Sequence, residues 1–480
     1  MSSSRHGGFF QAFSDLQRLP RAFWYVVGAF TVDAIAYFGT LTLMTVYLTN
    51  DFGWTDSEAS ITVSFFTMSV TLFMLGAGSY AESFGLKRAI VFALLLGVMG
   101  RIAYAWAVGL DAGPIAAAAV ILGSLVVVAL CEAILQPVCY SGVKQYTDER
   151  TSAMGYGLIY ALMNFCMVIA GGMSSWIRPG VERIRNSGSD GSIGDQPLEP
   201  LARRCGSGVQ AMNWVMMGVT ALTLVGFAVL MTRRAEAAKV RPDSAQEIRK
   251  ANKAPIKDRL YAYFAEGPFT NSRFLFFIFM LLPVRTLFAH QWLTMPQYIL
   301  RAYSQDVGDR MEWLILWINP LIIFVGVPIA TALTRQVHVY RMMILGALVS
   351  AVPTYLLCVE ANVWLLIAYF AIFSVGEAMW SARFLEYASE LAPEGRIAQY
   401  MGLASVPWLL AKGTTGLYSG WMLSRFCPEG TPREMLRTGM MWLIYGCIAM
   451  ASPIGLWLAR KWVMAGMATK SGGASSGTRS

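Results

Sequence analysis

Twelve apolar stretches, each about 20 residues long or longer, alternate with polar segments along the chain. A helix needs about 20 apolar residues to cross the hydrocarbon core of a bilayer, so stretches of this length predict membrane-spanning helices. We expect them at residues 23–48, 59–81, 87–110, 114–142, 152–176, 209–232, 273–300, 311–333, 341–359, 363–389, 397–424 and 437–461. The pattern predicts an all-α, polytopic membrane protein with twelve transmembrane helices.

The polar segments between these helices differ in length and charge. A Gly- and Ser-rich loop of about 30 residues follows the fifth helix, and the basic segment 233–271 follows the sixth. Most of the 38 Lys and Arg residues fall in the termini and in the loops on one side, which marks that side as cytoplasmic. We therefore expect a multi-pass plasma-membrane protein with 233–271 and both termini in the cytoplasm. The end of that segment either rests on lipid headgroups or belongs to a solvated linker.

Composition supports this topology and excludes other classes. The chain is 56% hydrophobic and 14% charged, against about 25% charged residues in soluble domains. Its net charge of +9 comes mainly from Lys and Arg in the loops of one side, as the positive-inside rule requires. We therefore expect the lipid bilayer as a partner and no nucleic acid. The seven cysteines show no metal-ligand spacing, so we expect no metal and no cofactor. Cys205 and Cys427 fall in predicted outer loops, where they form either a disulfide or two free thiols.

The two halves of the chain resemble each other. Glu132 lies in a long apolar helix that leads through a polar turn containing Arg150 into the next helix, and Glu377 precedes Arg396 in the same way, offset by about 245 residues. Internal repeats of this size are typical of transporters built from two six-helix halves. We expect a six-helix half at 1–232, a linker at 233–271, and a second half at 272–480 that ends in a disordered Gly/Ser-rich tail.

The turn between the second and third helices carries a compact motif. It combines Gly78, Glu82 and Gly85 with the basic pair Lys87 and Arg88. Glycine permits a tight turn and close helix approach, and an acid can cap a neighbouring helix end. This turn resembles the signature turn of the major facilitator superfamily, with Glu82 in place of the usual Asp. The resemblance implies twelve helices in two halves and a role for these five residues in conformational change.

Three patches resemble the proton-dependent oligopeptide transporters within that superfamily. They are Gly376-Glu377, Glu386-Tyr387 and Ala392-Pro393 in the tenth helix, Ile159-Tyr160 and Asn164 in the fifth, and Ala36-Tyr37-Phe38-Gly39 with Tyr47-Leu48 in the first. The first helix departs from the family motif Glu-x-x-Glu-Arg, because only Asp33 is acidic there. The fourth helix has Gln136 where the family usually has Lys before Pro. The resemblance implies proton-driven solute transport, with peptides as the first candidate substrate.

Ionisable residues inside the apolar helices are the candidate site. A charge in a membrane helix is costly and is usually kept for a function. Counting along the helices at about 1.5 Å per residue places Asp33, Glu132, Arg285, Glu377 and Lys412 near the midplane. We expect these five to bind solute or protons, and Glu377 to be the coupling acid unless it forms a permanent pair with Lys412.

Three further residues complete the candidate set. Gln136 and Asn164 occupy motif positions of the resembling family, and Trp380 follows Glu377 by one helical turn. Trp380 is either a wall of the binding pocket or a packing residue. Arg101 on the third helix either contributes to the site or pairs with Glu132 to hold the third and fourth helices together.

These observations predict a monomeric secondary transporter that works by alternating access, is coupled to protons and carries a small polar or zwitterionic solute. An efflux pump for amphiphilic compounds is the alternative within this class, and 27 methionines would suit it. A non-transporting membrane receptor is the alternative from another class. No catalytic residue set or phosphate-binding loop is evident in the sequence, so we do not expect an enzyme.

Overall fold

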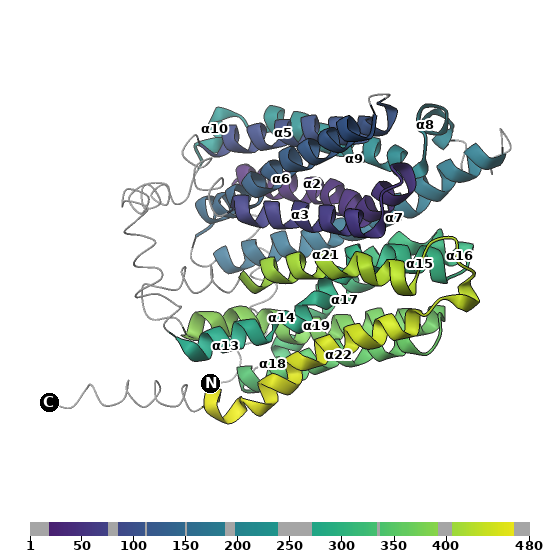
Figure 1. The fold of residues 1–480 in the computed structure, drawn as a ribbon. Coiled ribbons are helices and arrows are strands. Elements are labelled where there is room, and N and C mark those ends of the chain that lie inside the picture. The colour runs from purple at the N-terminus through teal and green to yellow at the C-terminus, as the bar shows by residue number, and fades with distance from the viewer. Residues whose placement is uncertain are drawn as a thin grey trace. The chain divides into compact units, whose positions relative to one another are not determined.

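The computed structural model describes residues 19–74, 85–110, 113–148, 151–187, 197–238, 271–333, 337–391 and 406–464 (Figure 1). In these residues the fold is all-α, as predicted, and each of the twelve expected spans is a helix or a run of helices. The first six are α2 (Arg21–Val46) with η1 (Tyr47–Asp51), α3 (Asp56–Met74), α5 (Leu86–Trp106) with η2 (Ala107–Gly109), α6 (Gly113–Tyr146), α7 (Ser152–Ser187) and α9 (Gly208–Leu230). The last six are α13 (Ser272–Met280) with α14 (Leu282–Leu293) and α15 (Met295–Ala302), α17 (Met311–Leu333), α18 (Val339–Ala351) with η5 (Val352–Cys358), α19 (Val363–Leu391), α21 (Val406–Phe426) and α22 (Thr438–Leu458).

Ten of the described helices are long and apolar enough to cross a membrane. In α17 the apolar stretch is shorter, Met311–Val327. Large apolar side chains are exposed on the outer faces of the helices, including Leu222 at 70% and Trp364 at 73%. Exposing so much apolar surface to water is unfavourable, so these faces contact lipid. The chain is therefore a polytopic membrane protein.

The chain divides into two compact units, which we describe separately. Unit 1 comprises Met1–Trp54 and Phe65–Lys253. In it, α2, α5, α6, α7 and α9 pack side by side (Figure 1). Its core contains fully buried Phe23, Val26, Ile90, Leu94 and Val138. These residues come from α2, α5 and α6, so the centre of unit 1 holds those helices in fixed register.

Unit 2 comprises Thr55–Ser64 and Ala254–Ser480. Here α14 packs against α21 and α22, and α19 packs against α17 and α18. The guanidinium of Arg301 forms a two-pronged ion pair with Asp56, with both N–O distances at 2.7 Å. Both side chains are more than 90% buried. This pair fastens α15 to the first residue of α3 within the unit.

The seventh span differs from the single helix expected at 273–300. It breaks at Leu281 and at Thr294, and a proline follows each break by two residues, Pro283 and Pro296. Proline lacks an N–H and cannot continue the helical hydrogen-bond ladder, which accounts for both interruptions. At the first break the N–H of Val284 donates to Ser452 Oγ of α22 at 2.9 Å, so the interrupted backbone is satisfied by a neighbouring helix.

The loop expected after the fifth span is largely helical in the described residues. Helix α7 continues to Ser187, and α8 (Glu199–Arg204) precedes α9. Glu182 accepts a hydrogen bond from the Gly208 N–H at 2.7 Å, and Arg185 donates to the Cys205 carbonyl at 2.6 Å. These contacts anchor the extended end of α7 to the start of α9. Cys205 and Cys427 are both free thiols.

Several predicted features lie outside the described residues. They are the first 18 residues, Gly78 and Glu82 in the turn, most of the linker, residues 392–405, and the tail from 465 onward. Of the linker, α10 (Arg233–Glu236) is described. The side chains of Glu386 and Tyr387 are also outside this set.

Candidate functional site

Unit 1 holds a buried cluster of charges built around Arg101 of α5. One guanidinium nitrogen donates to Glu132 Oε1 of α6 at 3.0 Å, and the other lies 3.6 Å from Asp33 Oδ1 of α2. The Thr220 hydroxyl of α9 donates to Asp33 Oδ1 at 2.7 Å. Exposure is 2% for Arg101, 1% for Asp33 and 8% for Glu132. The Arg101–Glu132 pair, one of the two alternatives considered for Arg101, is present, and the cluster joins four helices.

The close approach of α5 to α6 depends on glycine at this level. A Cβ at Gly97 would lie 2.8 Å from Cys131 Sγ and 3.1 Å from Arg101 Nη1. Both distances are shorter than ordinary van der Waals contact, so a side chain at Gly97 would displace the guanidinium or the thiol. Gly97 therefore makes room for the charged cluster.

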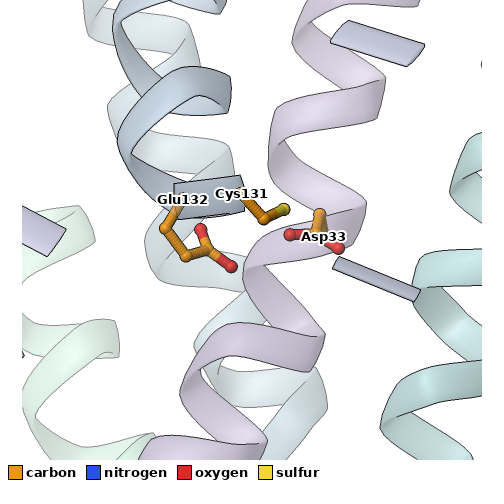
Figure 2. Close-up of side chains that lie close together, drawn as sticks. All are labelled: Asp33, Cys131 and Glu132. Atoms are coloured by element: carbon orange, nitrogen blue, oxygen red, sulfur yellow. The ribbon is translucent and has the colours of Figure 1, made fainter. Parts of the chain in front are cut away.

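Three side chains of this cluster lie as close together as the ligands of a metal ion. Asp33 of α2 faces Cys131 and Glu132 of α6, and their potential ligand atoms lie within 4.8 Å of one another (Figure 2). Arg101, however, already supplies a positive charge to both carboxylates. A divalent cation placed beside it would meet strong repulsion in a low-dielectric interior. These residues fit an internal ion pair with one surplus negative charge better than a metal.

In unit 2 the acid Glu377 is contacted by a neutral side chain. The Asn319 side-chain amide of α17 donates to Glu377 Oε2 of α19 at 2.7 Å and lies 3.0 Å from Ser374 Oγ. The Ser374 hydroxyl in turn donates to the Phe370 carbonyl at 2.6 Å. Among the described residues no ion pair includes Glu377. Its hydrogen-bond partner is Asn319, and the permanent ion pair with Lys412 that we considered from the sequence is not seen.

Aromatic rings enclose Arg285 of α14, which is 3% exposed. Its guanidinium carbon lies 4.2 Å from the ring centre of Phe384, 5.5 Å from that of Trp380 and 5.8 Å from that of Trp408. Cation–π attraction stabilises a guanidinium over such faces. Trp380, which we expected to be either a wall of the binding pocket or a packing residue, therefore lies beside Arg285, one of the residues expected to bind solute.

The remaining candidates have separate environments. The Lys412 ammonium lies 5.6 Å from the Trp408 ring centre, and its main-chain carbonyl accepts a hydrogen bond from Ser64 at 2.8 Å. Asn164 is buried and donates to the Tyr160 carbonyl of its own helix at 2.9 Å. Gln136 is half-buried on α6, next to Pro137.

The described part of the turn motif shows why glycine occurs there. Gly85 has φ 97° and ψ 147°, a conformation essentially reserved for glycine. The Lys87 N–H donates to Glu236 Oε1 at 3.1 Å, and the Lys87 ammonium donates to the Ala228 carbonyl at 3.0 Å. Arg88 is exposed. The turn thus joins α5 to the end of α9 and to α10.

Sequence reasoning missed Asn319, Ser374, Phe384 and Thr220. One signal was available: Asn319 is a polar residue before Pro320 in an otherwise apolar stretch. Ser, Thr and Phe occur throughout membrane helices, so the other three carry no such signal.

Comparisons with known proteins place this geometry in a family. The model of the Major Facilitator Superfamily matches residues 26–411. A search of curated proteins finds no match. Among solved structures, the chain is similar to the peptide transporter POT in complex with sulfate, with 17% identity and a TM-score of 0.66 over 92% of this chain and 95% of that one.

Two further structures give similar values. A POT family transporter in complex with 5-aminolevulinic acid has 15% identity and a TM-score of 0.66 over 92% of this chain and 97% of the other. A bacterial homologue of the human drug peptide transporters PepT1 and PepT2 has 14% identity and a TM-score of 0.62 over the same shares. At these identities the likeness shows a common fold. The family model spans most of the sequence, and the chain belongs to the Major Facilitator Superfamily.

Proposed function

We propose that the protein is a secondary transporter that carries a small polar or zwitterionic solute by alternating access and is driven by protons. Peptide-like compounds are the first candidates. One observation carries the proposal: each unit buries ionisable side chains inside its membrane helices. Such charges are costly in lipid and typically belong to solute or ion pathways.

The charged residues of the two candidate sets have opposite sign, leaving aside the buried Arg178 of α7 and Glu312 of α17, which belong to neither set. In unit 1 the carboxylates of Asp33 and Glu132 outnumber the guanidinium of Arg101 by one. In unit 2 the cations Arg285 and Lys412 outnumber the acid Glu377 by one. An acidic set suits an ammonium group or a proton, and a basic set suits a carboxylate. A zwitterion supplies both groups, which supports this substrate class over an amphiphilic cation.

The position of Arg285 also favours an anionic group of the solute. It lies in the first turn of α14, directly after the break at Leu281. The N-terminal end of an interrupted transporter helix carries a positive dipole, which attracts anionic parts of substrates. At this break the Val284 N–H is already bonded to Ser452, so the dipole and the Arg285 guanidinium are what would attract an anionic group. Of the structural neighbours, one is in complex with sulfate and another with 5-aminolevulinic acid.

We assign proton coupling to Glu377. A side-chain amide offers both a donor and an acceptor, so Asn319 can bond Glu377 when the acid is ionised and, after reorientation, when it is protonated. Glu132 is instead bonded to a permanent cation, Arg101, which favours its ionised form. Protonation of Glu377 can therefore change the local hydrogen bonding without leaving a buried group unsatisfied, as a switch between two conformations requires.

Topology and the turn motif belong to the same proposal. We infer halves at 1–232 and 272–480, a cytoplasmic linker at 233–271, cytoplasmic termini, a plasma-membrane location and a monomer. Gly78, Glu82, Gly85, Lys87 and Arg88 would act in conformational change. A cysteine introduced at Ser244 tests the orientation, because an impermeant thiol reagent should label it in permeabilised cells and not in intact ones.

The substrate class is tested in proteoliposomes. We expect an inward proton gradient to drive accumulation of some members of a library of amino acids, short peptides and related zwitterions. Thermal-shift measurements on the same library identify ligands independently of transport. Accumulation of amphiphilic cations alone would favour the efflux pump, and ligand binding without any transport would favour the receptor.

A further inference from the structure

An apolar groove runs along the outer face of unit 1 between α2 and α9. It encloses about 270 Å³, and its lining includes Trp24, Gly28, Leu222, Gly226 and Leu230. Leu222 is 70% exposed, Leu230 53% and Trp24 40%. The groove is therefore open to whatever surrounds the membrane face of these two helices.

Two glycines hollow the groove. A Cβ built on Gly28 of α2 or on Gly226 of α9 would have no heavy atom of the described residues within 4 Å. Both lie inside regular helix, where glycine is unfavourable compared with alanine. Neither backbone conformation nor close packing against the part of the chain that the structure describes requires glycine at these positions. The hollow is thus a property of the surface presented to an external molecule.

One end of the groove is strongly basic. Arg21 opens α2 one turn before Trp24, and Arg233 and Arg234 follow Leu230 on α10. All three arginines are exposed. Helix α10 contacts α2, with Ala235 packed against the core cluster that contains Ala22. The three cations therefore lie on the contacting ends of α2 and α10, three or four residues along the chain from the lining residues Trp24 and Leu230. The acid of α10, Glu236, accepts a hydrogen bond from the Lys87 N–H.

We propose that this groove binds an anionic phospholipid, with the phosphate on Arg21, Arg233 and Arg234 and an acyl chain lying over Gly28 and Gly226. Basic clusters at the ends of membrane helices attract anionic headgroups. Trp24 and Tyr25, at the basic end of the groove, are the aromatic residue types that favour the headgroup level of a bilayer. A second copy of the chain is disfavoured as the occupant, because it would bring a second cluster of arginines to the same surface.

The test measures lipid retained by the purified full-length protein. Wild-type protein is incubated with an equimolar mixture of phosphatidylglycerol and phosphatidylcholine, and bound lipid is counted by native mass spectrometry. We expect a preference for phosphatidylglycerol. Replacing all three arginines by glutamine should reduce that preference roughly 100-fold, because each basic residue near an anionic lipid surface contributes roughly fivefold and the three contributions multiply. Neutralising exposed Arg203 and Arg204, near the other end of α9, is the matched control and should change nothing.

A second pair of variants tests the groove itself. Gly28→Leu with Gly226→Leu should fill the hollow and release the bound lipid without disturbing the fold, since neither site has a neighbouring atom within 4 Å. Gly218→Leu, equally open on α9 and outside the groove, should retain it. Equal retention of both lipids by the wild type, or unchanged binding in the filled variant, would overturn the proposal. So would loss of a dimer on filling the groove, which would identify a second copy as the occupant.

Discussion

The guanidinium of Arg101 donates to Glu132 across 3.0 Å, and its other terminal nitrogen lies 3.6 Å from Asp33. One cation thus serves two acids that approach it from different helices. The Thr220 hydroxyl adds a hydrogen bond to Asp33 at 2.7 Å. We therefore expect the stability of unit 1 to depend on the balance of charge at this point more than on either ion pair alone.

Neutralising Arg101 should destabilise the protein, whereas neutralising Glu132 should not. Arg101→Gln leaves two carboxylates buried without a cation, and removing one partner of a buried ion pair costs about 3–5 kcal/mol. Glu132→Gln leaves the Arg101–Asp33 pair electrically balanced. The temperature at which half of the detergent-purified protein remains monodisperse measures the difference.

The double variant separates charge balance from packing. Arg101→Gln combined with Glu132→Gln should recover part of the stability lost in Arg101→Gln, because one uncompensated charge is removed. Equal losses in the two single variants, with no recovery in the double variant, would show that Arg101 acts through packing.

Gly85→Ala should lower both thermal stability and transport. Gly85 has φ 97° and ψ 147°, and a residue held in this region costs roughly 1–3 kcal/mol when it is not glycine. The nearest atom to an added Cβ, Glu236 Oε1, lies at an ordinary 3.7 Å, so the loss would report backbone strain. Gly218→Ala is the control, since its added Cβ meets no atom within 4 Å in a regular helix. Similar behaviour of the two variants would refute the requirement for glycine.

Arg285→Met should weaken binding of solutes that carry a carboxylate. A hydrogen-bonded charge contact contributes about 1.5–3 kcal/mol, equivalent to roughly 10- to 100-fold in affinity. Methionine keeps apolar contact with Phe384 and Trp380, so packing is largely retained. Thermal-shift titration with a zwitterion and with its amide analogue measures the effect. The variant should lose discrimination between the two; undiminished preference for the carboxylate form would exclude Arg285 as its partner.

Cys427 should destabilise the protein at alkaline pH. Burial raises the pKa of this thiol from 9.0 to about 12, despite the nearby Arg301 cation. Above pH 9 the unfolded chain releases this proton while the folded chain keeps it, so stability present at neutral pH is lost as pH rises towards 12. Cys427→Ala should therefore lose less stability than the wild type between pH 8 and about 10. Exposed Cys447→Ala is the control, and identical pH profiles of wild type and Cys427→Ala would contradict this.

The helices were predictable because each span must be apolar over a bilayer thickness. Pro283 and Pro296 also indicated the breaks in the seventh span, but hydropathy over 273–300 predicted a single helix because it does not register the missing N–H of proline. Helix α7 ran past its predicted end because Glu182 and Arg185 make polar contacts with residues 20 or more positions away. Hydropathy cannot represent such long-range contacts.

The sequence was enough to predict which residues belong to the candidate site. It was not enough to predict which of them contact each other. Asp33, Glu132, Arg285 and Glu377 are conspicuous because charges are rare in apolar helices. Their partners depend on which helix faces which. Arg101 was found from its charge, whereas Asn319 is neutral and lies about 58 residues before Glu377 in the sequence. A single sequence does not contain that helix pairing.

The central claim, that Glu377 couples protons to transport, is tested by comparing accumulation with exchange in proteoliposomes. Glu377→Gln keeps an amide that can bond Asn319, so the variant should fold and should exchange labelled substrate for unlabelled substrate across the membrane at a near-normal rate. We predict that it fails to accumulate substrate when an inward proton gradient is imposed, while the wild type accumulates it. Normal gradient-driven accumulation by Glu377→Gln would contradict the account and transfer coupling to Glu132 or Asp33.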